Sequence, residues 1–311
     1  MKHLFILNPA AGQRDRTAEF TKAIQTHCAG LDYEIAVSRH PGDCAVIARR
    51  AASTGQELRI YACGVDGTLN EVANGVVGRA NVSITHYCGG SGNDFVRAFS
   101  EPEAFGSLPR LLDCEETEFD LIQCGDHYAL NICSIGLDAR IGTSISKYKR
   151  LPLVTGPGAY ILSLIANLLK GIHEHYRITI DGEVFDGRYT LVCIANGRWY
   201  GGSFNPCPDA EPDDGMLEVL VVKPVNLLQV AMVIGKYQKG QYADYPQLIS
   251  HYRTRQVTVS CGEDSVVNLD GEALRSREVT FRISGEKLRF FYPRGLSYRM
   301  RERKTEEACA I

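Results

Sequence analysis

The chain has 311 residues, of which 44% are hydrophobic and 23% are charged. This composition is that of an ordinary folded protein and excludes disorder, collagen-like repeats and a coiled coil, while the length predicts two domains. The formal net charge of −3 argues against a general nucleic-acid binder, because such proteins carry a basic excess.

No segment has the length of a membrane span, and the cysteines have no metal-site spacing. The longest apolar stretch, residues 159–169, is shorter than the roughly 20 residues that cross a bilayer. The apolar run at Leu4–Leu7 is too short for a signal peptide. The 11 cysteines are scattered and include no CxxC pair, which indicates reduced thiols rather than a zinc site. We therefore expect a cytoplasmic protein.

The first hundred residues alternate between short apolar runs and segments of helical spacing. Strands are predicted at residues 4–7, 34–37, 58–63 and 82–87, and helices at 17–28, 44–52, 69–77 and 93–99. Repeated strand–helix units predict a parallel sheet covered by helices on both faces. Residues 1–122 are thus expected to form a doubly wound α/β nucleotide-binding domain.

The pattern changes near residue 118 to short β-rich runs separated by Asp-Gly and similar turns. These runs lie at 120–124, 129–132, 177–180, 190–195, 217–222, 256–260, 266–269, 278–283 and 288–292. Helices are predicted at 158–173 and 227–238. Such spacing predicts an antiparallel β-sandwich domain over 123–293. The polar tail, 294–311, is expected to fold back on the first domain.

Three glycine-containing turns follow predicted strands of the first domain: NPAAG at 8–12, GVDGT at 64–68 and GGSGND at 89–94. In parallel sheets this carboxyl edge is where ligands bind, and glycine lets the backbone approach an anion closely. Together the turns predict a nucleotide site, and the alternative is that they are ordinary tight turns. Neither a GxxxxGK[ST] loop nor a GxGxxG after the first strand is present.

The sequence resembles the diacylglycerol kinase catalytic-domain family, which includes bacterial lipid kinases and sphingoid-base kinases. NPAAG, GVDGTLNEV and GGSGNDFVR are similar to its three nucleotide motifs. The resemblance continues at 131–139, 208–219 and 268–272, in the same order along the chain. ATP-NAD kinases and phosphofructokinases are distant relatives of this family. Val65 stands where the family has glycine, so this position must be extended, because a β-branched residue disfavours positive φ. Ser91 and Ser38 replace family threonines.

The resemblance implies that ATP binds along the three loops and that Asp66 helps to organise Mg²⁺. The implied nucleotide residues are Asn8, Pro9, Gly12, Ser38, Gly64, Val65, Asp66, Gly67, Thr68, Asn70, Glu71, Gly90, Ser91, Gly92, Asn93 and Asp94. The alternative for Asp66, Asn93 and Asp94 is helix capping. Glu71 either orients neighbouring loops or is a solvated helix residue.

The resemblance also implies a general base, Glu272, and a structural Mg²⁺ held by Asp214 with the carbonyls of Glu211 and Met216. Composition cannot select Glu272, because Asp181-Gly182-Glu183 is the same tripeptide as Asp270-Gly271-Glu272. Only the resemblance favours Glu272. The alternative for the 211–216 loop is a solvated acidic segment.

Contact with an anionic membrane surface is predicted from three segments. Residues 159–169 are apolar enough for a lipid cleft, although a core helix is equally consistent. Residues 147–150 and 287–304 are basic enough to attract anionic lipid, although a solvated surface is the alternative. An exposed edge strand could support a homodimer.

The sequence therefore predicts an ATP- and Mg²⁺-dependent lipid kinase of phospholipid metabolism. It would transfer the γ-phosphoryl group to a hydroxyl of diacylglycerol or a related lipid at the cleft between the two domains, and the domain over 123–293 would hold the lipid substrate. The alternatives are an ATP-NAD kinase-like enzyme with a soluble acceptor and a nucleotide-binding regulatory module without catalysis.

Overall fold

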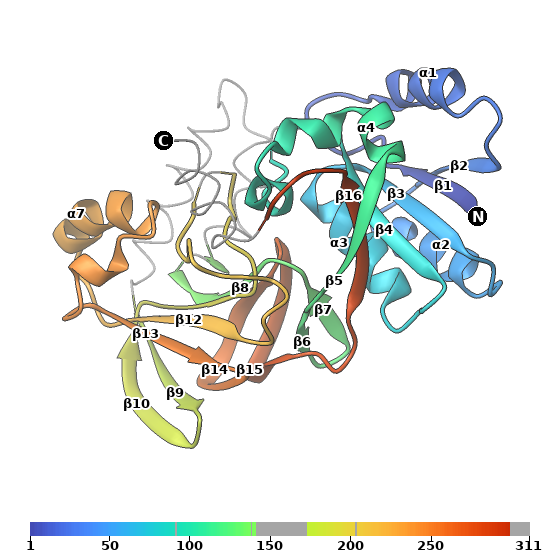
Figure 1. Cartoon of the computed structure of the whole chain (residues 1–311). Helices are drawn as coiled ribbons and strands as arrows, with labels where there is room; N and C mark the ends of the chain where they lie inside the picture. Colours follow the sequence, from blue (N-terminus) through green and yellow to red (C-terminus); the bar gives the residue numbers. More distant parts are fainter. Residues whose placement is uncertain (91, 138, 141–172, 203, 299–311) are drawn as a thin grey trace. The chain divides into compact units, whose positions relative to one another are not determined.

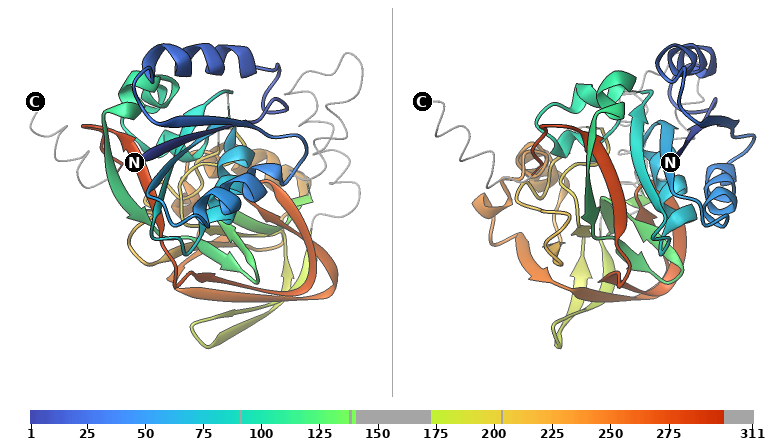
Figure 2. Two further views of the ribbon diagram at one scale, coloured as in Figure 1. Left: turned by 90° about the vertical axis from the view of Figure 1, so that its right-hand side faces the viewer. Right: turned by 45° about the vertical axis from the view of Figure 1, so that its right-hand side comes forward.

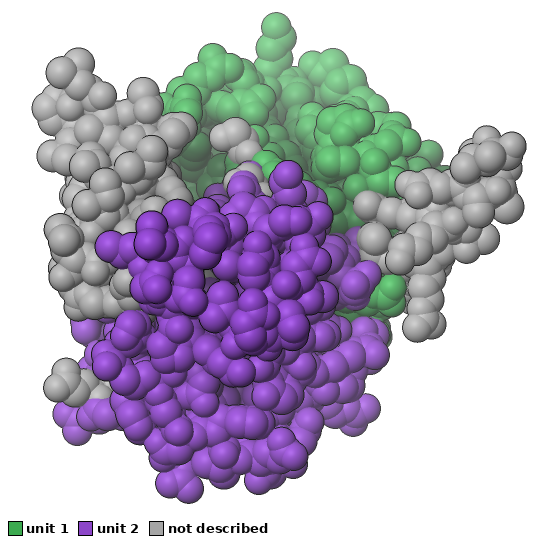
Figure 3. Space-filling model, turned by 90° about the vertical axis from the view of Figure 1, so that its left-hand side faces the viewer, with its two compact units in different colours: residues 1–121, 211–213, 284–311 green, residues 122–210, 214–283 purple. Residues whose placement is uncertain are grey.

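The computed structural model describes residues 1–90, 92–137, 139–140, 173–202 and 204–298 (Figure 1). The apolar segment 159–169, the basic residues 147–150 and Ser91 lie outside these ranges, as does most of the helix predicted over 158–173. Among the described helices, none combines the length and apolar character that a membrane span requires. The chain divides into a first compact unit of residues 1–121, 211–213 and 284 onward, and a second of residues 122–210 and 214–283 (Figure 3).

The first unit is built on a six-stranded sheet of order β2-β1-β3-β4-β16-β5. Its strands are β1 (Lys2–Leu7), β2 (Tyr33–Val37), β3 (Leu58–Gly64), β4 (Val82–Cys88), β5 (Cys114–Phe119) and β16 (Leu288–Pro293). The strands β1 to β4 are parallel to one another, β16 is parallel to β4, and β5 runs antiparallel to β16. Parallel strands are apolar on both faces, and Leu4 to Leu7 are accordingly buried.

Helices cover both faces of this sheet, which confirms the doubly wound fold. They are α1 (Thr17–His27), α2 (Asp43–Ala52), α3 (Asp66–Val76) and the short α4 (Leu108–Leu112). Helix α1 contacts α4, α2 packs on α3, and the two pairs lie on opposite faces (Figure 2). The close packing of α2 on α3 depends on Gly75, where an added Cβ would lie 2.6 Å from the carbonyl oxygen of Ala45.

Two predictions for the first unit differ from the structure, and the unit also contains α4 and β5, which were not predicted. The helix predicted over 93–99 is only a 3₁₀ turn, Phe95–Ala98, because neither end of the predicted range is helical: Asn93 has a left-handed φ of 51°, and Phe99 is extended with ψ 158°. A second 3₁₀ turn follows at Pro102–Gly106. The strand predicted at 288–292 belongs to this sheet and not to the second domain, because Phe290 packs its ring against Phe95, Phe99 and Phe119 of the first unit.

The second unit is one ten-stranded antiparallel sheet that curls around its own core. Its strands are β6 (Ile122–Cys124), β7 (His127–Ala129), β8 (Ile132–Gly136), β9 (Glu174–Ile180), β10 (Glu183–Tyr189), β11 (Leu191–Ala195), β12 (Leu217–Val222), β13 (Ile249–Thr254), β14 (Gln256–Leu269) and β15 (Glu272–Ile283). The long strand β14 pairs with β15 throughout, with β9 through residues 257–261 and with β8 through residues 267–269. An irregularity between Ser260 and Ser265 separates these two pairings.

This branching at β14 produces two layers that share the β14–β15 hairpin, which confirms the predicted antiparallel β domain. Apolar side chains from both layers form one buried cluster, including Ile135, Tyr176, Val192, Val259 and Phe281. The strands β10 and β13 were not predicted, because their sequences EVFDGRY and ISHYRT have alternate exposed polar residues and few apolar ones.

One described helix, α7 (Leu227–Tyr237), covers the other face of β11 and β12. Asn226 caps it: its side chain accepts the N–H of Gln229, and Gln229 in turn accepts the N–H of Asn226. The residues Val233 and Tyr237 of the helix are buried in a second apolar cluster with Leu191 and Val222. A 3₁₀ turn at Tyr242–Asp244 leads from the helix to β13.

Candidate functional site

The three glycine-containing loops of the first unit follow β1, β3 and β4, which are neighbours in the sheet, and they interlock at its carboxyl edge. The carbonyl oxygen of Gly64 accepts the N–H of Gly89 at 2.7 Å. The side-chain amide of Asn8 donates to the hydroxyl of Thr68 at 3.0 Å. These bonds hold the first loop against the second and the second against the third, as the sequence predicted for one shared edge.

Two glycines are required by these contacts. A Cβ on Gly64 would lie 2.3 Å from the hydroxyl oxygen of Thr68, and a Cβ on Gly90 would lie 2.4 Å from the Cγ1 of Val65. Val65 itself is extended, with φ −118° and ψ −177°, as its β-branched side chain requires. The valine that departs from the family pattern is therefore accommodated by the absence of a side chain at Gly90.

Asp66 is the first residue of α3, and its carboxyl group faces the third loop. Its Oδ1 accepts the N–H of Phe95 at 3.4 Å, and a Cβ on Gly92 would lie 2.9 Å from its Oδ2. Burial raises the pKa of this carboxyl, while the N–H groups of residues 93–95 act in the opposite direction. The residue before it, Val65, occupies the capping position, so helix capping does not explain Asp66. A half-buried carboxylate beside glycine-rich loops has the oxygen chemistry that Mg²⁺ prefers.

Asn93 and Asp94 shape the third loop rather than cap a helix. The amide nitrogen of Asn93 donates to the carbonyl of Gly90 at 2.7 Å, and its amide oxygen is buried without a hydrogen-bond partner in the described part of the chain. Asp94 is buried, lies 3.6 Å from the Arg97 guanidinium and makes no side-chain capping bond. The unsatisfied oxygen and the bare glycine backbone fit a nucleotide, whose hydroxyl and amino groups would supply donors.

Other predicted nucleotide residues support these loops. Both carboxylate oxygens of Glu71 accept N–H groups at the start of α2, from Gly42 at 2.9 Å and from Cys44 at 3.1 Å. Of the two alternatives for Glu71, the structure therefore favours orientation of a neighbouring loop. Asn70 is buried, and its side-chain oxygen accepts the amide of Asn74 at 3.1 Å.

The remaining predicted positions lie along the same edge. Ser38 directly follows β2, and its N–H donates to the carbonyl of Leu7. Pro9 and Gly12 belong to the first loop, where Gly12 has a left-handed φ of 83°. Gly67 lies in the first turn of α3. Ser91, the loop position that replaces a family threonine, is outside the described residues.

Sequence reasoning missed His86, a wholly buried residue of β4. Its Nε2 lies 3.1 Å from the carbonyl oxygen of Gly64, the same oxygen that Gly89 reaches. Burial lowers the pKa of His86 to about 4, so the ring is neutral and Nε2–H donates to the carbonyl. The available signal was a histidine within the apolar strand VSITHYC, two residues before a glycine loop.

In the second unit, Glu272 stands exposed at the first position of β15, after a two-residue turn. The turn residues Asp270 and Gly271 have φ values of 50° and 99°. The Asp270 carboxylate accepts three consecutive backbone N–H groups, from Leu130 at 2.6 Å, Asn131 at 3.1 Å and Ile132 at 2.8 Å. The structure thus brings together two segments that sequence analysis singled out, 131–139 and 268–272.

Asn131 connects the loop after β11 to this arrangement. Its carbonyl accepts the N–H groups of Asn196 and Gly197 at 2.9 Å, and its side-chain amide donates to the carbonyl of Trp199. A Cβ on Gly197 would lie 1.9 Å from the Asn131 side-chain oxygen. The loop after β11 was not predicted to contribute, and its only sequence signal is the Asn-Gly pair at 196–197.

The turn at Asp181-Gly182, between β9 and β10, has nearly the same backbone geometry, with φ values of 50° and 86°. Its aspartate accepts one hydrogen bond, from the hydroxyl of Thr254 at 2.6 Å. Glu183 after it is exposed, like Glu272. The two tripeptides therefore differ in what holds the aspartate and not in the turn.

The predicted structural cation would have to compete with an arginine. The Asp214 carboxylate contacts the Arg253 guanidinium at 2.5 Å and accepts the N–H of Met216 at 2.9 Å. The same guanidinium lies 3.3 Å from Glu218. Glu211 belongs to the first unit. Within the described ranges, no group of three or more His, Cys, Asp or Glu side chains is placed to hold a metal ion.

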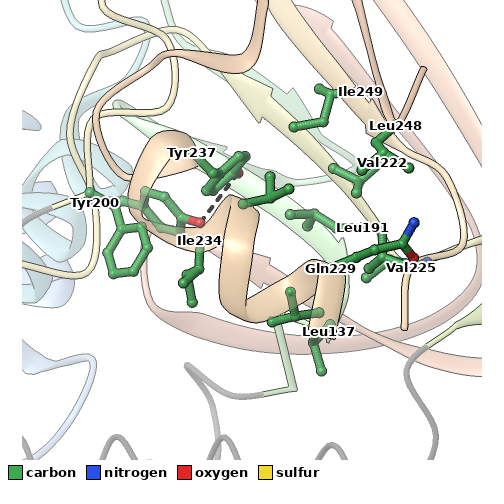
Figure 4. Close-up of a pocket in the computed structure, with 14 residues that line it drawn as sticks. Leu137, Leu191, Tyr200, Val222, Val225, Gln229, Ile234, Tyr237, Leu248 and Ile249 are labelled. Carbon is green, nitrogen blue, oxygen red and sulfur yellow. Dashed lines mark hydrogen bonds between the residues drawn. The ribbon is translucent and has the colours of Figure 1, made fainter. Parts of the chain in front are cut away.

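An apolar cavity of about 100 Å³ lies between α7 and the sheet in the second unit (Figure 4). Its walls are Leu137, Thr190, Leu191, Tyr200, Phe204, Val222, Val225, Gln229, Val230, Val233, Ile234, Tyr237, Leu248 and Ile249. The hydroxyl of Tyr200 donates to that of Tyr237 at 3.4 Å, so each of these hydroxyls has a partner within the protein. Such a lining suits hydrocarbon and not a charged ligand.

Both parts of the chain match known families. Residues 2–124 match the family described as "Diacylglycerol kinase catalytic domain". Residues 131–292 match the family described as "YegS C-terminal NAD kinase beta sandwich-like domain". A diacylglycerol kinase of Staphylococcus aureus strain MRSA252 is 28% identical over 270 residues, which cover 86% of this chain and 84% of the relative.

Solved structures share the fold over nearly the whole chain. A diacylglycerol kinase from Bacillus anthracis strain Sterne has a TM-score of 0.67 at 23% identity, covering 94% of this chain and 96% of the other. An NAD kinase from Archaeoglobus fulgidus, solved in complex with ATP, has a TM-score of 0.51 at 14% identity and covers 94% of each chain. These structures confirm the fold class predicted from the sequence, and the two family matches confirm the predicted resemblance.

Proposed function

The chain belongs through residues 131–292 to the family described as "YegS C-terminal NAD kinase beta sandwich-like domain", its residues 2–124 match the diacylglycerol kinase catalytic domain, and from these two matches we propose that it is an ATP- and Mg²⁺-dependent lipid kinase. Its acceptor would be the hydroxyl of diacylglycerol or a related lipid. The observation that carries the proposal is the interlocked edge of three glycine loops with the Asp66 carboxyl against the third loop. That edge offers backbone N–H groups and a metal-binding oxygen to a triphosphate.

In this proposal, the loops after β1, β3 and β4 bind the nucleotide. Mg²⁺, when bound, neutralises charge on the phosphates, and Asp66 is the residue that would hold it. His86 keeps the second loop in register with the third through Gly64 and does not contact the reacting atoms.

Glu272 is assigned as the general base of the second unit. Its carboxylate takes the proton of the acceptor hydroxyl as that oxygen forms a bond to the γ-phosphorus, and the bond from that phosphorus to the bridging oxygen of ADP breaks. Its exposure leaves the carboxylate accessible, and the three bonds to Asp270 fix the turn from which it projects.

The test is transfer of label from γ-labelled ATP to defined acceptors. Purified protein is incubated with Mg²⁺ and mixed micelles of diacylglycerol, monoacylglycerol, ceramide, sphingosine or undecaprenol, with NAD as the soluble control. We expect label in one lipid class, no transfer after chelation of Mg²⁺, and at least about a hundredfold loss in Asp66→Asn, since it removes a charged metal ligand. Label in NADP alone would contradict the lipid acceptor.

A further inference from the structure

The outward side of α7 is an apolar surface. Leu227, Leu228 and Met232 are 56%, 77% and 62% exposed, and Ala231 and Gly235 beside them are also exposed. These five positions, which we call the α7 face, recur at the spacing of one side of a helix. A surface helix of a folded domain normally presents polar residues there. Here the buried side, with Val233 and Tyr237, is apolar as well.

The residues that flank the α7 face are basic. The segment 219–243 contains three lysines, Lys223, Lys236 and Lys239, and no acidic residue. Lys236 lies in the last turn of α7 and pairs with Asp244 at 3.1 Å, while Lys223 precedes the helix and Lys239 follows it. Apolar side chains bordered by cations at both ends complement a bilayer with anionic head groups, to which each nearby lysine contributes attraction.

We propose that the α7 face docks this protein on a bilayer that contains anionic phospholipid. Helix α7 would lie in the interface, with Leu228 and Met232 entering the acyl boundary and the lysines at the head groups. A second copy of the chain is a poorer occupant, because stable protein interfaces use about 20–30 residues on each side, and the α7 face offers five positions. The inference rests on the proposed function only in that a lipid kinase must reach a bilayer.

The test is sedimentation of the full chain with sucrose-loaded vesicles, without nucleotide. Vesicles of phosphatidylcholine alone are compared with an equal mixture of phosphatidylglycerol and phosphatidylcholine. We expect binding to the mixed vesicles, weakened by salt, and at least about a tenfold weaker partition coefficient for L228S/M232S, since two exposed apolar side chains no longer enter hydrocarbon. Lys223→Glu with Lys239→Glu is expected to abolish the preference for anionic vesicles.

Matched controls are Val46→Ser on α2 and Val184→Ser on β10, which remove exposed apolar side chains elsewhere (54% and 48% exposed). Both should bind vesicles as the wild type does, and circular dichroism should show all variants folded. Equal vesicle binding by L228S/M232S and the wild type would overturn the proposal. So would a change in sedimentation velocity from dimer to monomer in L228S/M232S with vesicle binding intact, because the face would then join two copies.

Failure of this inference is distinguishable from failure of the proposed function. Phosphorylation of a short-chain diacylglycerol dispersed in detergent does not require docking and should be unchanged in L228S/M232S. If that reaction is absent in the wild type while vesicle binding depends on the α7 face, the acceptor assignment is wrong and the docking surface stands. If the reaction proceeds and L228S/M232S still binds vesicles, the docking surface is wrong and the kinase assignment stands.

Discussion

The three glycine-containing loops of the first unit and the hairpin that carries Glu272 in the second unit are held in different ways. In the first unit, the Gly64 carbonyl accepts the buried His86 ring and the N–H of Gly89, at the end of strands covered on both faces. In the second, Glu272 is exposed, and its turn is fixed by one carboxylate, Asp270, on three N–H groups. Loop geometry is thus maintained by burial in one unit and by a single charged anchor in the other.

The two regions should therefore respond to different substitutions. A buried arrangement loses stability when a group is added or charged, because the interior cannot relax or solvate it. An exposed hairpin tolerates changes to its outer side chains and loses geometry only when its anchor is removed. The duplicate Asp181-Gly182-Glu183 hairpin supplies a matched control for the second unit.

The largest expected effect is on catalysis. Glu272→Gln should lower kcat by about 10²–10⁴-fold, because the amide cannot accept the hydroxyl proton, with little change in the urea midpoint. Glu183→Gln, the same substitution on the duplicate hairpin, should leave kcat within about twofold. Steady-state kinetics with a micellar acceptor measure both. Equal activities for the two variants would remove the distinction between the hairpins.

The next largest effect is a pH dependence in the first unit. The pKa of His86 is about 4 in the folded protein and about 6.5 when exposed, so the unfolded state binds the proton first as the pH falls. The stability that the neutral ring contributes is present above pH 6.5 and is lost by pH 4, a difference of about 3 kcal/mol. The free energy of unfolding, measured with urea at each pH in this range, should fall less steeply with decreasing pH in His86→Gln than in the wild type. Parallel curves for the two proteins would contradict a buried neutral ring.

The third largest effect is expected when the Asp270 anchor of the second unit is removed. Asp270→Asn keeps a side chain that tolerates left-handed φ but loses the charge that three N–H groups share, and should lower the free energy of unfolding by about 2 kcal/mol. Asp181→Asn, which affects one bond to Thr254, should cost no more than about 1 kcal/mol. Urea denaturation measures the loss in the free energy of unfolding for each variant. Reversal of this order would show that the anchors are not what separates the hairpins.

The smallest expected effect concerns the fit of Val65 over Gly90. Gly90→Ala places a Cβ within 2.4 Å of Val65 Cγ1 and should destabilise the protein by about 1–2 kcal/mol while weakening ATP binding. Adding Val65→Gly removes the clash, so the double variant should recover ATP affinity relative to Gly90→Ala. Isothermal titration with ATP measures this coupling. Additive losses in the double variant would argue against the contact.

Local sequence patterns were sufficient to predict much of the fold and the meeting of the three glycine-containing loops. Four apolar runs became β1 to β4, and the glycine turns after three of them meet because β1, β3 and β4 are adjacent. The return of residues 288–293 to the first sheet was not predictable, since Phe290 finds its partners among residues far away in the sequence. The anchor of Asp270 was missed for the same reason, because its partners at 130–132 precede it by well over a hundred residues.

The prediction for the loop at 89–94 was wrong for a different physical reason. Asn93 and Asp94 are typical of a helix start, and although asparagine tolerates left-handed φ, the sequence does not show that Asn93 uses it to bond the Gly90 carbonyl instead of capping a helix. Likewise, nothing local distinguishes Glu272 from Glu183 or pairs Asp214 with Arg253. Motif resemblance selected Glu272 where turn chemistry could not.

We propose that this chain phosphorylates a lipid hydroxyl with ATP, using Glu272. The most direct measurement is mass spectrometry of products formed from γ-labelled ATP and a total lipid extract by the wild type, Glu272→Gln and Glu183→Gln. We expect one labelled phospholipid with the wild type and Glu183→Gln, and none with Glu272→Gln. Labelled lipid in equal amounts from all three proteins, or label only in water-soluble products, would contradict it.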